Sequence, residues 1–557
     1  MLATLIIWAY SFALFYIYGW GGLIFLRKIF RLQDETSLSG SVIVVAGMAI
    51  LTTLASFLSL FIPLGRLAAI LILIGGILIA ITTRPWKKIR LPAYHFLVWV
   101  LLAAAGLTIL ENATHAPTNS DTALYHAQAI RWIESFRVVP GLANLHNRLG
   151  FNSSWFVLNA AFSFAFLEIQ SFHLMNSVIM LVGSFYFSRG LQNILQRKIT
   201  TSSIAKTALF FLSLYLYGND IASPSTDFPA TLLTWMVSVL LLEKLESRGI
   251  QFDIFSVVIF LLAIFALTVK LSVLPLAVIA FLVVLQQIRI KDSVRTLRLV
   301  GLGLLVLLPW LVRNVILSGY LVFPVSQIDI FGFDWKYPRE NADANRLAII
   351  WFARFPGKNW SDFVGLSFNA WAPQWFNGLS FIQRNLFSVA IMSPLILVLF
   401  MKERGSRLFK QFFLPYFVNY MGLIFWFLTA PDVRFGYGFL TMSIVLAFSP
   451  LIALVLTQFT SYTGFVTAIL FPLLIFYQGY LLAEAADPVF IKQHLILPAD
   501  YLPSRADPCP ISNGTVFCRK EGGQCNYDDF PCIPSPRPNV EMRGANWQDG
   551  FRTVQVP

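Results

Sequence analysis

Long apolar stretches alternate with short polar connectors along most of the chain. They recur from Leu2 to Ala483, and many approach the roughly 20 apolar residues that a helix needs to cross a bilayer. The pattern predicts about fourteen membrane-spanning helices. They lie near residues 3–25, 41–63, 66–83, 93–110, 172–187, 205–218, 229–243, 253–269, 272–288, 297–317, 384–401, 411–429, 437–457 and 463–483. We therefore expect an all-α polytopic membrane protein.

One apolar stretch is expected not to cross. Residues 151–167 and 172–187 follow each other closely, yet the charge of the next connector permits only one crossing between them. The first stretch is short and begins with the polar residues Asn152, Ser153 and Ser154. It is therefore predicted to lie flat or to re-enter the membrane.

Basic residues are concentrated in alternate connectors, near residues 27–31, 84–90, 189–206, 244–248, 289–298 and 402–410. The short connectors between them hold only Arg66 and Lys270. The positive-inside rule places the basic set in the cytosol. Both termini and the long polar segments at 111–170 and 318–383 then face away from the cytosol, and the protein is expected in the plasma (inner) membrane.

Composition supports a membrane protein and changes how the net charge is interpreted. The 557 residues are 57% hydrophobic and only 12% charged, whereas soluble proteins carry about 25% charged residues. The net charge of +13 comes largely from the alternate connectors, so it indicates membrane orientation and not a nucleic-acid partner.

The polar end of the chain holds all four cysteines: Cys509, Cys518, Cys525 and Cys532. The predicted topology puts them in an oxidising compartment, where disulfides persist. Their spacing does not match the Cys-x-x-Cys pair of a zinc site. Two disulfides are expected, with the pairing left open.

The first polar segment contains a candidate catalytic carboxylate. In TNSDTALYHAQAIRW, Asp121, Tyr125, Gln128 and Trp132 stand at helical offsets of four, seven and eleven, so they share one face of a helix. The alternative is a carboxylate that simply sits in a first helical turn, where Asn119 or Ser120 can cap.

Other polar residues of this segment are candidates for binding a substrate: His126, His146 and Arg148. A metal is conceivable there, but the histidine spacing fits no known ligand motif, and hydrogen-bonded structural histidines are the alternative. No cofactor is assigned, and a divalent cation stays an open alternative.

Three cations are set near the predicted outer ends of helices: Lys270, Arg313 and Arg434. Ionisable groups at membrane depth are usually functional, and a phosphate is the ligand that such cations suit best. The alternative is that they reach to lipid headgroups. Asp227 lies in a nearby outer turn, as a substrate-binding candidate or as the cap of the next helix.

Taken in order, several segments resemble the GT-C superfamily of membrane glycosyltransferases. These are SDTALYHAQAIRW, the flat stretch after it, STDFPA, LTVKLS, LLPWLVRNVILSGYLVFP and DVRFGYG, which together span roughly residues 93–460. The stretch VVPGLANLHNRLGFNSSW and the cysteine-bearing end also resemble a bacterial branch of multi-pass membrane proteins.

The resemblance implies a domain organisation. Residues 1–92 would add three transmembrane helices, residues 93–483 would form a GT-C-like catalytic core, and residues 484–557 would form an extracytoplasmic tail. Juxtamembrane helices and loops are expected on the outer face, from the segments at 111–170 and 318–383.

It also implies a reaction. A hexosyl or pentosyl group would pass from a polyprenyl-phosphate donor to a glycan, lipid or protein acceptor, with inversion. Asp121 would be the base, while Lys270, Arg434 and Arg313 would hold the phosphate. The alternatives are a polysaccharide polymerase or ligase acting on lipid-linked glycans, and a lipid or glycan transporter.

Overall fold

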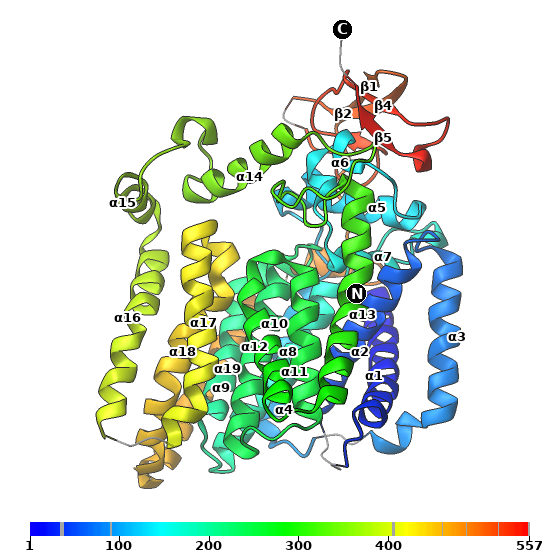
Figure 1. Ribbon diagram of the computed structural model, residues 1–557. Helices are drawn as coiled ribbons and strands as arrows, with labels where there is room; N and C mark the ends of the chain where they lie inside the picture. The colour runs from blue at the N-terminus through cyan, green and yellow to red at the C-terminus, as the bar shows by residue number, and fades with distance from the viewer. Residues whose placement is uncertain are drawn as a thin grey trace.

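A computed structural model describes residues 1–33, 38–89, 92–403, 407–458, 460–485, 487–521 and 523–554. Long helices stand side by side in a bundle, and a small domain with short strands covers one end of it (Figure 1). We call the end that carries this domain the upper end, as it is drawn.

Every stretch predicted as a membrane crossing is helical. The helices are α1 (Leu2–Phe30), α2 (Gly40–Leu58), α3 (Arg66–Thr83), α4 (Phe96–Asn112), α8 (Met175–Leu195), α9 (Thr201–Tyr217), α10 (Asp227–Ser247), α11 (Ile254–Val269), α12 (Ala277–Arg289), α13 (Ser293–Ser318), α16 (Phe381–Glu403), α17 (Arg407–Thr429), α18 (Val433–Gln458) and α19 (Thr460–Ala485). Among the described residues, nine helices are long and apolar enough to cross a membrane by length and composition. The chain is thus a helical membrane protein, and the larger number of crossings stays a prediction.

The distribution of apolar side chains fits a bundle immersed in lipid. In α10, 94% of the apolar window is buried, whereas in α3 and α16 only 17% is. Side chains such as Leu78 and Ile81 of α3 and Val398 of α16 are exposed. Figure 1 shows α3 and α16 at opposite flanks with α10 between them. Such wide apolar surfaces on a folded chain mark contact with a membrane or a partner.

Small residues let the first two helices approach closely. A Cβ atom at Gly19 of α1 would collide with the backbone of Ile43, and one at Gly47 of α2 would collide with the backbone of Phe15. Transmembrane helices associate through such small residues because lipid gives no hydrophobic drive to associate. α1 and α2 therefore form a tight pair at one side of the bundle.

The apolar stretch after the first polar segment forms only a short helix, α7 (Ser154–Ala161). Eight residues rise about 12 Å, far less than the roughly 30 Å hydrocarbon core. A helix this short fits the prediction that the stretch does not cross, which stays a prediction. Its first residues attach it to the end of α11, since the Ser153 hydroxyl donates to the Val269 carbonyl at 2.7 Å and Ser154 bonds the Thr268 hydroxyl.

The two polar segments supply the structure around the upper end. The first forms the π-helical turn η2 (Thr122–His126), α5 (Ala127–Ser135), α6 (Leu142–Leu145) and the turn η3 (Asn147–Gly150). The second forms α14 (Arg339–Arg354), the turn η7 (Trp360–Phe363) and α15 (Phe368–Gly378). Both lie at the upper end (Figure 1). The remaining short turns are η1 (Pro85–Lys88), η4 (Ala165–Leu167), η5 (Gly218–Asp220) and η6 (Leu271–Leu276).

The tail begins with α20 (Pro488–Gln493) and carries five short strands within its described part. These are β1 (Ala506–Ile511), β2 (Gly514–Arg519), β3 (Cys532–Ile533), β4 (Val540–Met542) and β5 (Phe551–Thr553), with the turn η8 (Trp547–Asp549) before the last. β1 pairs antiparallel with β2, β2 parallel with β3, and β4 antiparallel with β5. Both expected disulfides are present, as Cys509–Cys518 and Cys525–Cys532.

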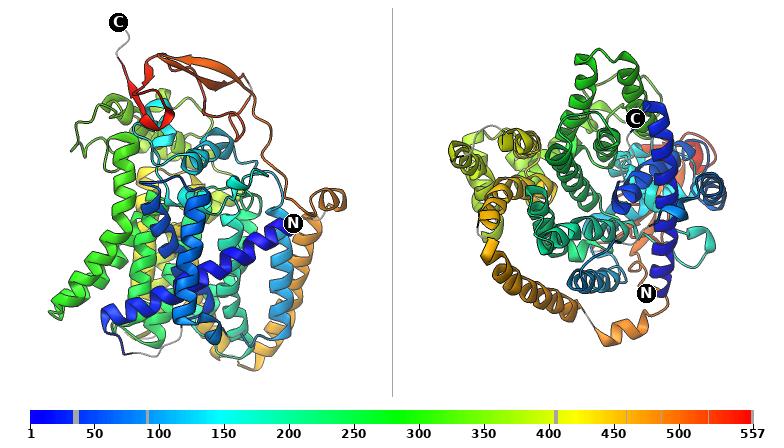
Figure 2. Two further views of the ribbon diagram at one scale, coloured as in Figure 1. Left: turned by 90° about the vertical axis from the view of Figure 1, so that its right-hand side faces the viewer. Right: turned by 90° about the horizontal axis from the view of Figure 1, so that it is seen from below.

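The start of the chain lies beside the segment that leads into the tail. The amino group of Met1 donates to the His494 carbonyl at 2.7 Å, and α19 lies beside α4. Seen from below, α19 runs from the side of α16–α18 back to the side where the chain begins (Figure 2).

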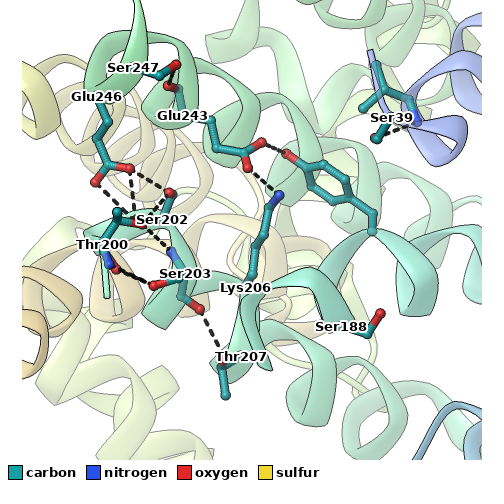
Figure 3. Close-up of polar contacts among 12 residues, drawn as sticks. Ser39, Ser188, Thr200, Ser202, Ser203, Lys206, Thr207, Glu243, Glu246 and Ser247 are labelled. Carbon is teal, nitrogen blue, oxygen red and sulfur yellow. Dashed lines mark hydrogen bonds and ion pairs between the residues drawn. The ribbon is translucent and has the colours of Figure 1, made fainter. Parts of the chain in front are cut away.

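Near the lower end of α10, a charged pair joins α9 to α10 beside α8, and Figure 3 shows its contacts. Lys206 pairs with Glu243, and the Tyr186 hydroxyl donates to the same carboxylate at 2.8 Å. The Lys206 ammonium also lies 4.0 Å from the centre of the Tyr186 ring. Next to it, the Ser202 hydroxyl donates to Glu246 at 2.5 Å. We call these residues the Lys206 cluster.

Candidate functional site

At the upper end of the bundle, one carboxylate is held between two arginines. Arg434 Nη1 lies 2.9 Å from Asp121 Oδ2, and Arg148 Nη1 lies 3.2 Å from Asp121 Oδ1. Arg434 stands in the first turn of α18, and its Nε also pairs with Asp432 Oδ2 at 3.1 Å. Residues 313 positions apart in sequence are thereby joined.

A second ion pair adjoins the first. Lys270, which directly follows α11, pairs with Asp227, the first residue of α10. The Lys270 ammonium lies 4.1 Å from the centre of the Phe435 ring, and the Arg434 guanidinium lies 4.9 Å from the same ring. Phe435 therefore links the two pairs. We call Asp121, Arg148, Asp227, Lys270, Asp432 and Arg434 the Asp121 cluster.

The Asp121 cluster has a formal charge of zero, because it contains three cations and three carboxylates. It is also reachable: the side chains of Arg148, Arg434 and Lys270 are 38%, 34% and 21% exposed. Burial is the largest single influence on Asp121 and opposes its ionisation, but the groups around it, with Arg434 foremost and Arg148 among them, together lower the pKa of the carboxyl below its ordinary value. Asp121 is thus ionised, and it is a weak proton acceptor while both arginines hold it.

Local structure fixes where Asp121 stands. Its backbone N–H donates to Asn119 Oδ1 at 2.9 Å, and Asn119 Nδ2 donates to Asp220 Oδ1 at 3.0 Å. Asn119 therefore caps this segment, as the alternative interpretation expected, while Asp121 also contacts the two arginines. The chain then makes a π-helical turn, a conformation that is frequent at functional sites.

Tyr125 and His126 lie directly under the cluster. The Tyr125 ring stacks below the Arg148 guanidinium at 5.4 Å. His126 is 3% exposed, and its Nδ1 lies 3.1 Å from the Thr122 hydroxyl, which in turn bonds Ser223. Burial lowers the pKa of His126 to about 3, so the ring is neutral at physiological pH. It can position its neighbours by hydrogen bonding but does not add a positive charge.

Gln128 lies elsewhere than the sequence indicated. Its amide group donates to the carbonyls of Asn526 and Asp529 at 3.0 and 2.9 Å and accepts from the Cys532 N–H at 3.0 Å. Trp132 packs on Phe530 of the tail. The predicted common face therefore divides: Asp121 and Tyr125 belong to the cluster, while Gln128 and Trp132 bind the tail. The physical reason is the π-helical turn between them, which changes the helical register.

Arg313 also lies apart from the cluster. Its Nη1 donates to Ser59 Oγ at 2.7 Å and its Nε to Asn152 Oδ1 at 3.2 Å, so it joins α13 to α2 and to the start of α7. It lines a cavity of about 20 Å³, which has room for roughly one water molecule and none for a phosphate. These contacts make Arg313 a structural link, and it is not part of the proposed phosphate site.

His146 is buried at the start of η3, two residues before Arg148. Burial lowers its pKa to about 3, and its Nδ1 has no hydrogen-bond partner within the described residues. A neutral, enclosed imidazole cannot supply charge to a substrate, so we do not retain it in the site.

Asp432 and Phe435 were not predicted as site residues. Asp432 lies in the same turn as Arg434, two residues before it, but an acidic residue before the start of a helix is ordinarily a cap. Within the described ranges, no group of three or more His, Cys, Asp or Glu side chains is arranged so that it could hold a metal ion.

The chain belongs to the family described as Domain of unknown function (DUF8201), whose model matches residues 1–441. The matched region contains all six residues of the Asp121 cluster and ends before the tail. No curated protein and no solved structure matches the chain.

Proposed function

We propose that this member of the DUF8201 family is a membrane glycosyltransferase that uses a polyprenyl-phosphate sugar as donor. It transfers a hexosyl or pentosyl group to a glycan, lipid or protein acceptor on the extracytoplasmic face of the plasma membrane. The observation that carries this proposal is the Asp121 cluster: an ionised carboxylate between two arginines, beside a lysine, at one end of an apolar bundle.

Two features support the extracytoplasmic location. α10 begins at Asp227 in the Asp121 cluster and runs down to the basic connector at 244–248, which the positive-inside rule assigns to the cytosol. The tail domain that contains both disulfides lies at the same end of the bundle as the cluster (Figure 1), and disulfides persist in an oxidising compartment.

The cations suit the phosphate of the donor. Guanidinium and ammonium groups bind phosphate oxygens through charge-assisted hydrogen bonds, and they stabilise the negative charge that develops as a phosphate leaves. A lipid phosphate is already a good leaving group. No strong general acid is needed, and the cluster contains none.

The closeness of Asp121 and Arg434 has a mechanistic consequence. In an inverting displacement, the base and the leaving phosphate lie on opposite faces of the anomeric carbon. A 2.9 Å contact leaves no room for a sugar between them. Donor binding must therefore separate the pair, with phosphate oxygens replacing the carboxylate as partners of Arg434 and Arg148.

This exchange activates the base only when the donor is bound. Freed from the arginines, Asp121 regains basicity and accepts the proton of the acceptor hydroxyl. The hydroxyl oxygen forms a bond to the anomeric carbon as the bond from that carbon to the phosphate oxygen breaks. The electron pair of the broken bond stays on the polyprenyl phosphate, which the cations hold.

The test uses purified protein in lipid nanodiscs and a panel of polyprenyl-phosphate hexoses and pentoses, with release of free polyprenyl phosphate as the readout. We expect release with at least one donor, lost in Asp121→Asn and retained in Asp362→Asn, which alters an exposed carboxylate in the second polar segment. Donor transfer between leaflets without bond cleavage would instead indicate a transporter and overturn the proposal.

A further inference from the structure

The eight-residue loop closed by the Cys525–Cys532 disulfide lies on one face of α5. Gln128 binds this loop at three points. Its Nε2 donates to the carbonyls of Asn526 and Asp529, and its Oε1 accepts from the Cys532 N–H. All three bonds are 2.9–3.0 Å long, and Gln128 is 1% exposed. One side chain thus holds the loop at its beginning, middle and end.

The next turn of α5 also binds the loop. Arg131 Nη1 donates to the carbonyls of Tyr527 and Asp528, and its guanidinium lies within 5 Å of the Tyr527 and Phe530 rings. The Tyr527 hydroxyl donates to Glu134 at 2.6 Å. Polar and aromatic contacts therefore fix the loop to α5 along its length.

The loop also reaches the turn that carries Asp121. The Asn526 N–H donates to the Ala123 carbonyl at 2.9 Å, and Ala123 lies two residues after Asp121 in the π-helical turn. The Ala123 carbonyl, which accepts this hydrogen bond, belongs to the π-helical turn, where the usual α-helical pattern of hydrogen bonds is interrupted. The disulfide is thus connected to the position of Asp121 through a short series of hydrogen bonds.

We propose that the Cys525–Cys532 loop is a positioning element that keeps Asp121 between Arg434 and Arg148, and that Gln128 and the Ala123 carbonyl are the points through which it acts. The inference rests on the proposed role of Asp121. The backbone that carries a catalytic group must be held within about 0.5 Å of its place by surrounding contacts, both while the arginines hold the carboxylate and after the donor releases it. Asp121 lies before the π-helical turn and not inside a long regular helix, so its segment needs such support.

The disulfide makes this support dependent on redox conditions. A closed loop presents the four carbonyls that α5 binds and its N–H groups in one fixed arrangement, whereas an opened loop samples many arrangements and binds α5 less well. Reduction of Cys525–Cys532 should therefore loosen the Asp121 segment without breaking any bond inside the transmembrane bundle.

The test compares Gln128→Met, which keeps the side-chain length but removes all three hydrogen bonds, with Gln374→Met, which alters an exposed glutamine of α15. The readout is hydrogen–deuterium exchange of the amides at residues 122–127. We expect about tenfold or faster exchange in Gln128→Met and no change in Gln374→Met. The parent protein should show the same increase after reduction, and so should the Cys509→Ser/Cys518→Ser variant, which retains only the Cys525–Cys532 bridge.

A second readout follows the chemistry. In Gln128→Met, the acidic limb of the pH profile of kcat/KM should move to higher pH, because a displaced Asp121 loses the field of Arg434 that lowers its pKa. A residue with a purely structural role would lower the amount of active protein and leave this limb in place.

The two proposals can fail separately. Unchanged exchange at 122–127 in both Gln128→Met and the reduced protein would overturn the positioning role, whatever the activity. The other outcome is increased exchange in Gln128→Met and in the reduced protein, while the parent cleaves no polyprenyl-phosphate sugar. That result would support the positioning role and overturn the glycosyltransferase proposal.

Discussion

The two ends of α10 each carry a carboxylate that pairs with a lysine, and the two surroundings differ. At the lower end, Lys206 is 1% exposed and its partners come from the neighbouring helices α8 and α10 (Figure 3). At the upper end, Lys270 is 21% exposed and adjoins charged residues from four separate segments. A buried ion pair is thus not itself a sign of function.

The difference lies in what each cluster can still do. In the Lys206 cluster, the Tyr186 ring covers the ammonium group and the Tyr186 hydroxyl donates to the carboxylate. The charges therefore contact each other and Tyr186 within the packed helices. The Asp121 cluster keeps guanidinium groups that are about one-third exposed, and in the proposed function they exchange a carboxylate for a phosphate. We therefore expect changes at the upper end to affect chemistry and changes at the lower end to affect stability.

The largest effect is expected for Asp121→Asn, which keeps the shape of the side chain and removes the base. Turnover should fall by about 10²–10⁴-fold, the usual contribution of general acid–base catalysis, while donor binding persists. Single-turnover transfer and equilibrium binding of the polyprenyl-phosphate donor would measure the two properties. Near-normal turnover in purified Asp121→Asn protein would exclude the assigned role.

At the other end of α10, Glu243→Gln should destabilise the fold by about 3–5 kcal/mol, because Lys206 stays buried without its counter-charge. Thermal unfolding in detergent measures this loss, and turnover per folded molecule should not change. The matched control is Lys206→Met/Glu243→Leu, in which both charges are removed and stability should largely return. Lost turnover with an unchanged melting temperature would contradict the comparison.

Lys270→Met and Arg434→Met should weaken donor binding selectively. Loss of one charge-assisted hydrogen bond costs about 1.5–3 kcal/mol, equivalent to roughly 10- to 150-fold in affinity. If these cations served only lipid headgroups, the variants would instead show lower expression or melting temperature with unaltered affinity. Donor binding as tight as that of the parent in both variants would refute the phosphate site.

The smallest effect concerns pH, and it tests whether the donor displaces Asp121 from its arginines. The profile of kcat/KM reports the free enzyme, in which Arg434 lowers the pKa of Asp121. The profile of kcat reports the donor complex, in which the proposed mechanism has that pair broken. The acidic limb of kcat should therefore lie at higher pH than that of kcat/KM.

Arg434→Gln provides the control for this pH effect. Removing the guanidinium raises the pKa of Asp121 in the free enzyme, so the acidic limb of kcat/KM should move up toward that of kcat. Coincident limbs in the parent protein would mean that the donor does not release Asp121.

Local sequence properties were enough for much of the fold. The apolar stretches predicted the helices because a membrane-spanning helix is formed by consecutive residues. Its apolar length and the polar residues at its ends can therefore be identified in the sequence. The short, polar start of the stretch at 151–167 indicated a helix that does not cross, and α7 has eight residues. The four cysteines predicted two disulfides, although their pairing required the structure.

The candidate site was only partly predictable. Asp121, Lys270, Asp227 and Arg434 stood out because each is an ionisable group beside apolar helices. Regular helical spacing suggested that Gln128 shares their site, but the π-helical turn and the docked tail turn it to another partner. Arg313 has the same local signature as Lys270, yet the structure commits it to Ser59 and Asn152.

The sequence by itself determined which residues are apolar enough to form helices and which carry charge. Tertiary structure alone decided which charges meet. Asp121 and Arg434 are 313 positions apart, and no local pattern of residues encodes a contact over that distance. Their pairing results from how α10, α11 and α18 pack, because that packing brings the ends of these helices to one place.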